Sequence, residues 1–322
     1  MKIMKIIPVE KIREADAATI KNEPISSIDL MERASIQLFN WVKEHVAPEK
    51  KIHIFCGLGN NGGDGLALGR MLAKMGYLVI INIIRYSEKT SGDFQKNYVR
   101  LTGISGITIV NIKNVNEIPS IDPYDVIVDA IFGSGLTQSV KGFLYEVISL
   151  INNSRAITIA IDMPTGLFAD RTSVDGKSEI IKADYTLSFQ FPKLAFLLPE
   201  NEMYVGNWEV VDIGLSNDYI NATKTKNQLV LFEDIKPLLK GRSKFSHKGT
   251  YGHALLIAGS YGKMGAAILC SRACLKAGVG LLHTHVPKVG IQILQTASPE
   301  TMISIDRFDN YFSEVPEIGS YN

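Results

Sequence analysis

Apolar and polar positions along the first two thirds of the chain alternate in the manner of a mixed helical and stranded domain. Residues 10–22 show the spacing of an amphipathic helix, and a second helix is expected to begin near Ser26, where Ser26-x-x-Asp29 has the form of a capping box. Short apolar runs then alternate with helical stretches, and we expect strands at residues 53–56, 77–84, 107–110, 126–128, 157–161, 185–189 and 208–213. This alternation predicts a Rossmann-like, three-layer α/β/α domain with a mostly parallel sheet.

A polar stretch after Gly214 ends this alternation and precedes a second, smaller unit. We therefore expect a first domain at residues 1–222, a linker at 223–240 and a second unit at 241–322. The second unit reads as a strand, a loop, a helix at 264–277 and a further strand. Its Gly259-Ser-Tyr-Gly-Lys263 segment is superficially like a P-loop, but Met264 stands where a P-loop needs a hydroxyl group.

The run Gly57-Leu-Gly-Asn-Asn-Gly-Gly-Asp-Gly65 lies between the first expected strand and a helical pattern at 66–75. Glycines permit close backbone approach to a ligand, and unpaired amides at a helix start favour an anionic group such as a phosphate. Two asparagines and an aspartate exceed what a tight turn requires, so they are expected to be recognition groups. A tight turn without a ligand is the alternative.

Two other nucleotide-site interpretations of this run are weak. Gly57-x-Gly59-x-x-Gly62 is typical of NAD-dependent dehydrogenases, but the following strand ends in Arg85 and Tyr86, without the acid that binds a ribose. No Lys-Ser or Lys-Thr follows the glycines, which argues against a P-loop. The sequence contains no Gly-x-Ser-x-Gly motif, so it gives no support for the catalytic triad of a hydrolase.

Composition limits the partners that the chain can attract and the cellular compartment that it suits. The 322 residues carry 34 basic and 33 acidic side chains, for a formal net charge of +1, so no global field favours nucleic acid or an anionic membrane. Three cysteines give no disulfide framework, which favours a reducing cytoplasm. Lys5 and Pro8 interrupt the N-terminal apolar stretch too early for a signal peptide, and no apolar run approaches membrane length.

Two acids follow or end apolar strand patterns. Asp129 ends the run from Val126, and Asp162 follows residues 157–161, so both carboxylates are expected at the carboxyl edge of the sheet beside the glycine run. Such a pair suits acid/base chemistry or a cation, although a helix cap or turn role is the alternative for each. Thr165, after Pro164, adds an oxygen suited to a metal ion.

Several ordered motifs resemble one known family. The segment GLGNNGGDGLALGR resembles the signature of the YjeF N-terminal family, the NAD(P)H-hydrate epimerases. Further matching segments follow in order at residues 128–136, 160–167, 183–189 and 192–193, and the opening resembles the family at 12–16 and 30–34. The resemblance runs from about residue 9 to about residue 215.

The resemblance implies epimerisation of the R and S forms of hydrated NADH and NADPH, here NADHX and NADPHX. It implies K+ bound by Asn61, Asp129 and Thr165. Catalytic roles are expected for Asp162 and, as a second group, for Lys193, although a lysine after a strand is usually a solvated charge. The implied substrate-binding residues are Asn60, Asn61, Gly62, Gly63, Asp64, Gly133, Ser134, Gly135, Leu136, Thr137, Gln138, Ser139 and Asp162.

The second unit resembles the opening of the ADP-dependent NAD(P)H-hydrate dehydratase domain, which has a ribokinase-like fold. Matching features include His247-Lys248-Gly249 and Pro299-Glu300. The later motifs of that domain are missing, so we expect a partial ribokinase-like unit and a non-functional dehydratase half. A binding-only protein, a dinucleotide-dependent oxidoreductase, and a broken bifunctional enzyme remain alternatives, and a homodimer stays open.

Overall fold

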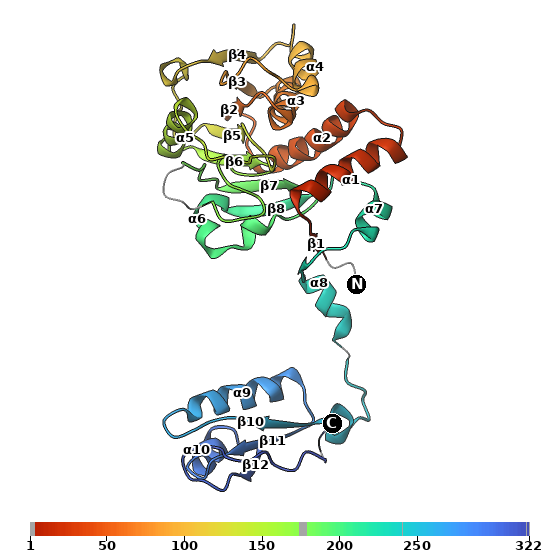
Figure 1. The fold of residues 1–322 in the computed structure, drawn as a ribbon, viewed down its shortest axis with the longest axis vertical. Helices are drawn as coiled ribbons and strands as arrows, with labels where there is room; N and C mark the ends of the chain where they lie inside the picture. Colours follow the sequence, from red (N-terminus) through yellow and green to blue (C-terminus); the bar gives the residue numbers. More distant parts are fainter. Residues whose placement is uncertain (1–3, 174–178, 240, 320, 322) are drawn as a thin grey trace. The chain divides into compact units, whose positions relative to one another are not determined.

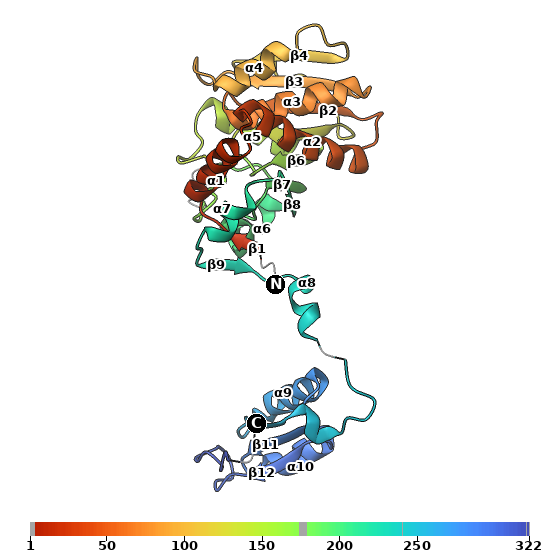
Figure 2. The same cartoon turned by 90° about the vertical axis from the view of Figure 1, so that its right-hand side faces the viewer.

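The structure is a computed structural model that describes residues 4–173, 179–239, 241–319 and 321. The chain divides into two compact units, Met1–Lys236 and Pro237–Asn322 (Figures 1 and 2). Each unit has its own sheet and its own buried core. Each is therefore described by itself.

The first unit is built on a sheet of seven parallel strands. They are β2 (Lys51–Cys56), β3 (Leu78–Ile84), β4 (Ile107–Ile112), β5 (Val126–Ala130), β6 (Ile157–Ile161), β7 (Tyr185–Phe189) and β8 (Asn207–Val211). Their spatial order is β4-β3-β2-β5-β6-β7-β8, so the order reverses between β2 and β5. The expected parallel, doubly wound sheet is confirmed, and the strands differ from expectation only at their ends.

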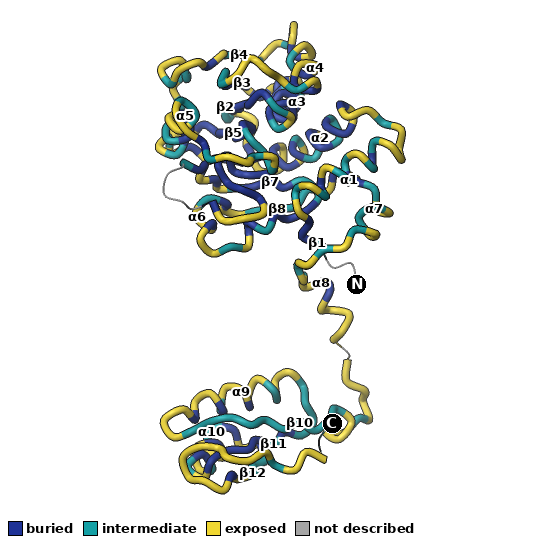
Figure 3. The backbone as a smooth tube through the Cα atoms, in the orientation of Figure 1, coloured by how far each residue is buried: buried dark blue, intermediate teal, exposed yellow. Residues whose placement is uncertain are grey.

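Helices cover both faces of this sheet. Successive residues of a strand point to opposite faces, so they pack in different cores. Ile52 and Ile54 of β2 pack in a core that also contains residues of the helices before and after it in the chain, whereas Phe55 packs with Val147 and Ile148 from the opposite layer. Figure 3 shows the buried strands between these layers. The helices are α1 (Val9–Asn22), α2 (Ser27–His45), α3 (Asn60–Lys74), α4 (Gly92–Arg100), α5 (Phe143–Asn153), α6 (Glu202–Val205), α7 (Asn217–Ala222) and α8 (Phe232–Ile235).

The first two helices form where the sequence predicts them. The Ser26 hydroxyl accepts from the Asp29 amide, and the Asp29 carboxylate accepts from the Ser26 amide, so the predicted capping box is present at the start of α2. One stripe of α1, with Ile12 and Ala15, packs in a core with Phe191, which follows β7. This packing holds α1 beside the carboxyl ends of the strands.

The structure differs from the expected linker at residues 223–240. Part of that stretch is β9 (Asn227–Leu229), which pairs antiparallel with β1 (Met4–Ile6), and α8 follows it. The Thr225 hydroxyl donates to the Ile6 carbonyl at 2.5 Å. A three-residue, mostly polar strand gives no periodic signal, and its partner lies at the other end of the unit. Residue 240, the last of the expected linker, lies outside the described residues.

The second unit contains a small parallel sheet in the order β10-β11-β12, formed by β10 (His253–Ile257), β11 (Leu281–Val286) and β12 (Met302–Ile305). The helices α9 (Met264–Ala277) and α10 (Gly290–Ala297) connect them, so the expected α/β unit is confirmed. Its buried core is small, and every residue of β10 is only half-buried. Among the described residues, no helix has both the length and the apolar character that crossing a membrane requires.

The pairing of β1 with β9 fixes where the first unit can be cut. A chain ending at Lys236 retains β9 and should keep the thermal unfolding transition of the first unit. A chain ending at Ala222 loses β9 and the bond from Thr225, a loss of about 2 kcal/mol from net hydrogen bonding. Its Tm should be lower by about 4–8 °C, measured by circular dichroism. Equal Tm values for the two truncations would contradict this role of β9.

Candidate functional site

A cavity of about 590 Å³ opens at the carboxyl ends of β2 and β5, where the strand order reverses. Doubly wound sheets bind ligands at this position, because the connections on its two sides leave in opposite directions. The segments after β2, β5 and β6 all contribute to the cavity, and α1 contributes from outside the sheet. Residues far apart in the sequence therefore meet in one place.

The glycine run is mostly helix rather than the turn that the sequence suggests. Helix α3 begins at Asn60, and its N-cap, Gly59, provides no side-chain hydrogen bond. A methyl group on Gly65 would lie 2.6 Å from Ala130 Cβ, so the helix packs directly on the sheet. As at the start of any α-helix, the first amides of α3 have no intrahelical acceptors, so they are available to an anionic ligand.

Close backbone contacts hold the turn after β2 against the segment after β5 and against the start of α3. A methyl group on Gly57 would lie 2.0 Å from the Ile131 carbonyl oxygen, and one on Gly62 would lie 1.9 Å from the Gly57 carbonyl oxygen. Gly62 and Gly63 are buried and do not line the cavity. Their expected role in binding substrate is therefore limited to their backbone and to the packing of α3.

Asp162 and Lys193 form a buried ion pair. Asp162 follows β6 with a φ of 63°, an unusual backbone conformation for a residue other than glycine. Its Oδ1 lies 2.8 Å from Lys193 Nζ, and its Oδ2 accepts from the Ser134 amide at 2.8 Å. Lys193 is 1% exposed and also donates to the Ser188 hydroxyl. Lys193 is thus not the solvated charge that its sequence context suggests.

Three carboxyl groups line the cavity in different electrostatic environments. Burial raises the pKa of Asp64 well above its ordinary value, and the charges of Asp162, Asp16 and Asp93 add to this. Burial, followed by the charge of Asp162, raises the pKa of Asp16 to about 6, against the opposing charge of Lys193. Burial also disfavours ionisation of Asp162, but Lys193 and the Ser134 amide outweigh it and lower its pKa.

Asp129 and Thr165 are in direct contact but do not line this cavity. Asp129 Oδ1 accepts from the Thr165 hydroxyl at 2.7 Å and from the Ile131 amide at 3.1 Å, and Oδ2 accepts from the Thr165 amide at 2.7 Å. Both residues are fully buried. Burial raises the pKa of Asp129 to about 6, although these hydrogen bonds lower it in part. Among the described residues, no basic side chain pairs with Asp129.

Asn61, the third expected cation ligand, lies with Asp162 beside Gly133. A methyl group on Gly133 would lie 2.9 Å from Asp162 Oδ2 and 3.3 Å from Asn61 Oδ1. The Asn61 Nδ2 atom is buried and has no hydrogen-bond partner within the described part of the chain. Asn61 lines the cavity, whereas Asp129 and Thr165 do not. Of the three expected cation ligands, Asp129 and Thr165 therefore contact each other, and Asn61 lies at the cavity wall.

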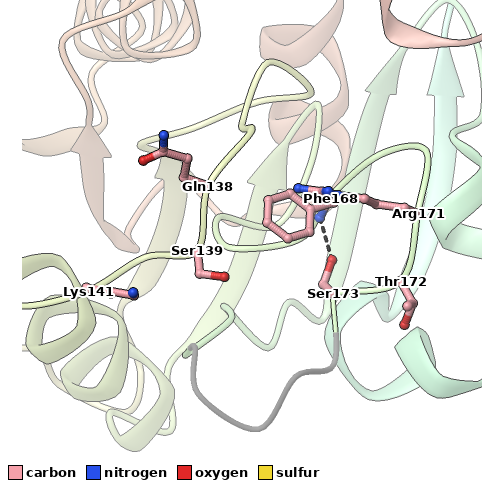
Figure 4. Close-up of a pocket in the computed structure, with 7 residues that line it drawn as sticks. All are labelled: Gln138, Ser139, Lys141, Phe168, Arg171, Thr172 and Ser173. Atoms are coloured by element: carbon pink, nitrogen blue, oxygen red, sulfur yellow. Dashed lines mark hydrogen bonds between the residues drawn. The ribbon is translucent and has the colours of Figure 1, made fainter.

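The segment after β5 borders two cavities. Ser134, Gly135, Leu136, Thr137 and Gln138, for which the family resemblance implies a role in substrate binding, line the first one. Ser139 instead lines a second cavity of about 520 Å³, shown in Figure 4, which Gln138 also borders.

The second cavity carries positive charge. Its other lining residues are Lys141, Phe168, Arg171, Thr172 and Ser173, and Arg171 donates to the Thr137 carbonyl at 3.0 Å. In Figure 4 the Arg171 guanidinium lies over the Phe168 ring, 4.2 Å from its centroid. This segment thus separates an acidic cavity from a basic one.

Three polar side chains that line the cavity, Arg13, Asp16 and Tyr86, are not among the site residues predicted from the sequence. The Tyr86 hydroxyl accepts from the Leu58 amide at 3.2 Å, so it supports the turn before α3. In the sequence, Arg13 and Asp16 fall within the opening segment that resembles the family, and no other motif includes them. Residues 12, 13 and 16 share one side of an amphipathic helix, which is the signal that could have placed them together.

The family model described as "YjeF-related protein N-terminus" matches residues 27–195, more than half of the chain. The chain belongs to the YjeF N-terminal family. The family resemblance found in the sequence motifs is thereby confirmed. A second family model, described as "NAD(P)H-hydrate dehydratase", matches residues 254–314, within the second unit.

Curated relatives of this YjeF-family chain carry two kinds of name. The NAD(P)H-hydrate epimerase of Oenococcus oeni is 34% identical over 62% of this chain and 92% of the relative. The bifunctional NAD(P)H-hydrate repair enzyme of Moorella thermoacetica is 31% identical over 98% of this chain and 62% of the relative. The chain thus spans somewhat less than two thirds of the bifunctional relatives that it matches first.

A solved structure shares the fold of the YjeF-family unit. The crystal structure of the yeast protein ynu0 superposes with a TM-score of 0.57 at 21% identity. The match covers 68% of this chain and 93% of the yeast chain. It supports the three-layer α/β architecture described above.

The buried ion pair between Asp162 and Lys193 makes a stability prediction. Removing one partner leaves the other charge buried, so Asp162→Asn and Lys193→Met should each lower the free energy of unfolding by about 3–5 kcal/mol. The double variant should lose less than the sum of the two. Urea unfolding of the four proteins measures this cycle. Additive losses would show that the two side chains do not interact.

Proposed function

We propose that this chain interconverts the R and S forms of hydrated NADH and NADPH by inverting the ring carbon that bears the hydroxyl group. The observation that carries the proposal is an ionised carboxylate, Asp162, in the same cavity as the open amino end of α3. One group suits proton exchange with a hydroxyl, and the other suits a diphosphate. The name of the Oenococcus oeni relative, NAD(P)H-hydrate epimerase, supports the same substrate class.

The residues of the cavity then have separate roles. The amides at Asn60 and Asn61 bind the diphosphate, which positions the hydrated ring near Asp162. Lys193 keeps Asp162 ionised and fixes one of its oxygens, while the Ser134 amide fixes the other. Asp162 exchanges a proton with the ring hydroxyl or with water. We restrict the proposal to epimerisation, because this cavity belongs to the first unit alone.

A K+ ion near Asp129 is part of the proposal, and the residues present fit it. Asp129 is a fully buried carboxylate beside the Thr165 hydroxyl, and no basic side chain among the described residues compensates its charge. The described residues contain no cluster of three or more His, Cys, Asp or Glu suited to a metal, so hydroxyl, amide and carbonyl oxygens would supply the remaining ligands. When bound, the cation compensates the buried charge and orders the segments after β5 and β6.

Two other classes are separable from this proposal. A dinucleotide-dependent oxidoreductase would need an acid for the ribose at the end of β3, where Arg85 instead donates to the Asn111 side chain at 2.8 Å. A binding-only protein would retain the cavity and bind the hydrates without equilibrating them. Oxidation of ordinary NADH, followed at 340 nm, tests the first class, and epimer chromatography tests the second.

The epimerisation test uses NADHX enriched in one epimer and follows both epimers by chromatography with time. Wild-type protein should accelerate equilibration, and Asp162→Asn should lower kcat by about 10²–10⁴-fold, because an amide cannot accept the proton. The assay temperature should lie below the unfolding transition of the variant. The matched control is Asp170→Asn, an exposed carboxylate outside both cavities, which should keep wild-type rates. A wild-type protein that leaves the epimers unchanged would refute the proposed function.

The cation prediction has a readout that does not depend on activity. At equal ionic strength, KCl should raise Tm relative to LiCl by about 2–4 °C when the free cation is several times its Kd. Asp129→Asn should abolish that difference, because it removes the negative ligand. Asp218→Asn, an exposed acid on α7, should preserve it. Equal Tm values of the wild-type protein in the two salts would exclude the K+ site.

A further inference from the structure

Asp16 is a carboxyl group that lines the cavity. Among the described residues, it makes no hydrogen bond and no ion pair of 4 Å or less. Asp16 is half-buried on α1, one turn after Ile12, and both residues line the cavity that Asp162 borders. Because Ala15 and Thr19 are fully buried, α1 cannot rotate to expose Asp16 without losing core contacts.

The charged groups that face Asp16 favour its protonated form, so Asp16 can act as the acid in a pair with Asp162. Asp162 and Asp64 face it from the segments after β6 and β2, Lys193 faces it from the segment after β7, and Arg13 borders the cavity from the same helix. Lys193 is already 2.8 Å from Asp162, so its charge chiefly compensates that carboxylate. Burial and the charge of Asp162 raise the pKa of Asp16 to about 6. Two carboxyl groups in one cavity with separated pKa values are typical of an acid and a base.

Resting on the proposed epimerisation, we propose that Asp16 donates the proton to the departing ring hydroxyl, and that Asp162 accepts the proton of the water that returns. The C–O bond breaks, its electron pair goes to the oxygen, and that oxygen leaves as water with the proton of Asp16. The ring-nitrogen lone pair forms a C=N⁺ bond. Water then adds to the opposite face, its proton passes to Asp162, and the C=N electrons return to nitrogen. Proton transfer from Asp162 to Asp16 through water restores the starting state.

Each carboxyl group suits its assigned step. Departure of a hydroxyl group requires a protonated acid, which a carboxyl of ordinary pKa does not supply near neutral pH. Water that adds to an iminium carbon becomes strongly acidic, so the ionised and weakly basic Asp162 suffices as acceptor. Asp64 is less suited, because burial and the charges of three neighbouring carboxyl groups all raise its pKa, and no basic group opposes them. Arg13 does not release a proton at any relevant pH.

The kinetic test compares wild-type protein, Asp16→Asn and Asp16→Glu in the chromatographic epimer assay between pH 5 and pH 9. The wild-type kcat, corrected for the uncatalysed rate, should fall as pH rises above about 6. Asp16→Asn should lose about 10²-fold or more in kcat with little change in KM, and its residual rate should not follow that profile. Asp16→Glu should recover part of the rate and its pH dependence. Glu10→Gln, an exposed change on the same helix, should match wild type.

Thermal unfolding tests, in the absence of substrate, whether Asp16 carries a proton in the folded protein. A carboxyl whose pKa is raised on folding stabilises the fold below its unfolded pKa, and that contribution is lost as pH rises through the folded value of about 6. The Asp16→Asn variant has no titrating carboxyl group at this position, so it does not lose this stabilisation as pH rises. Its Tm relative to wild type should therefore be higher at pH 7.5 than at pH 4, and the Glu10→Gln difference should not change with pH.

The outcomes separate this role from the proposed function. A wild-type chain that does not equilibrate the epimers overturns the epimerase function and this step with it. An active wild type with an equally active Asp16→Asn, or with an unchanged pH profile in that variant, overturns only the role of Asp16. A Tm difference between Asp16→Asn and wild type that is the same at both pH values also overturns it, because folding would then not raise the pKa of Asp16.

Discussion

The close backbone contact between the segments after β2 and β5 is the constraint on which the cavity depends. Gly57 lies against the Ile131 carbonyl, and Gly62 lies against the Gly57 carbonyl, with no space for a methyl group at either position. These contacts place the amino end of α3 next to the segment that carries Ser134. A side chain at Gly57 would push the two segments apart, and one at Gly62 would push the start of α3 away from the turn before it. Displacements of about an ångström are costly for reactive groups.

Charge is distributed unevenly within this frame, and a single buried lysine is the cause. Lys193 lies beside Asp162 and makes it the readily ionised carboxylate of the cavity, while Asp16 and Asp64 remain without a basic partner of their own among the described residues. The left-handed backbone of Asp162 directs its two oxygens to different donors, Lys193 and the Ser134 amide. The local strain is thus compensated by two charge-assisted contacts.

Much of the fold was predictable because its signals are local. Strand and helix periodicity predicted the order of the elements, and the capping box at Ser26 predicted the start of α2. The early start of α3 at Asn60 was not predictable, since Asn and Gly have low helix propensity and only packing on the sheet makes the helix favourable there. The position of Asp162 followed from strand order, whereas the burial of Lys193 and the placement of Asp16 depend on tertiary contacts made by distant segments.

The strand pair β1–β9 also has a consequence for how the protein is made. Met4 precedes its register partner Leu229 by 225 residues, so β9 is added only near the end of the first unit. At ordinary translation speeds this separation is on the order of ten seconds or more. During that interval β1 emerges from the ribosome with its backbone groups unpaired, so closure of the unit must wait for β9, and the nascent chain is exposed to chaperones over a defined stretch of synthesis.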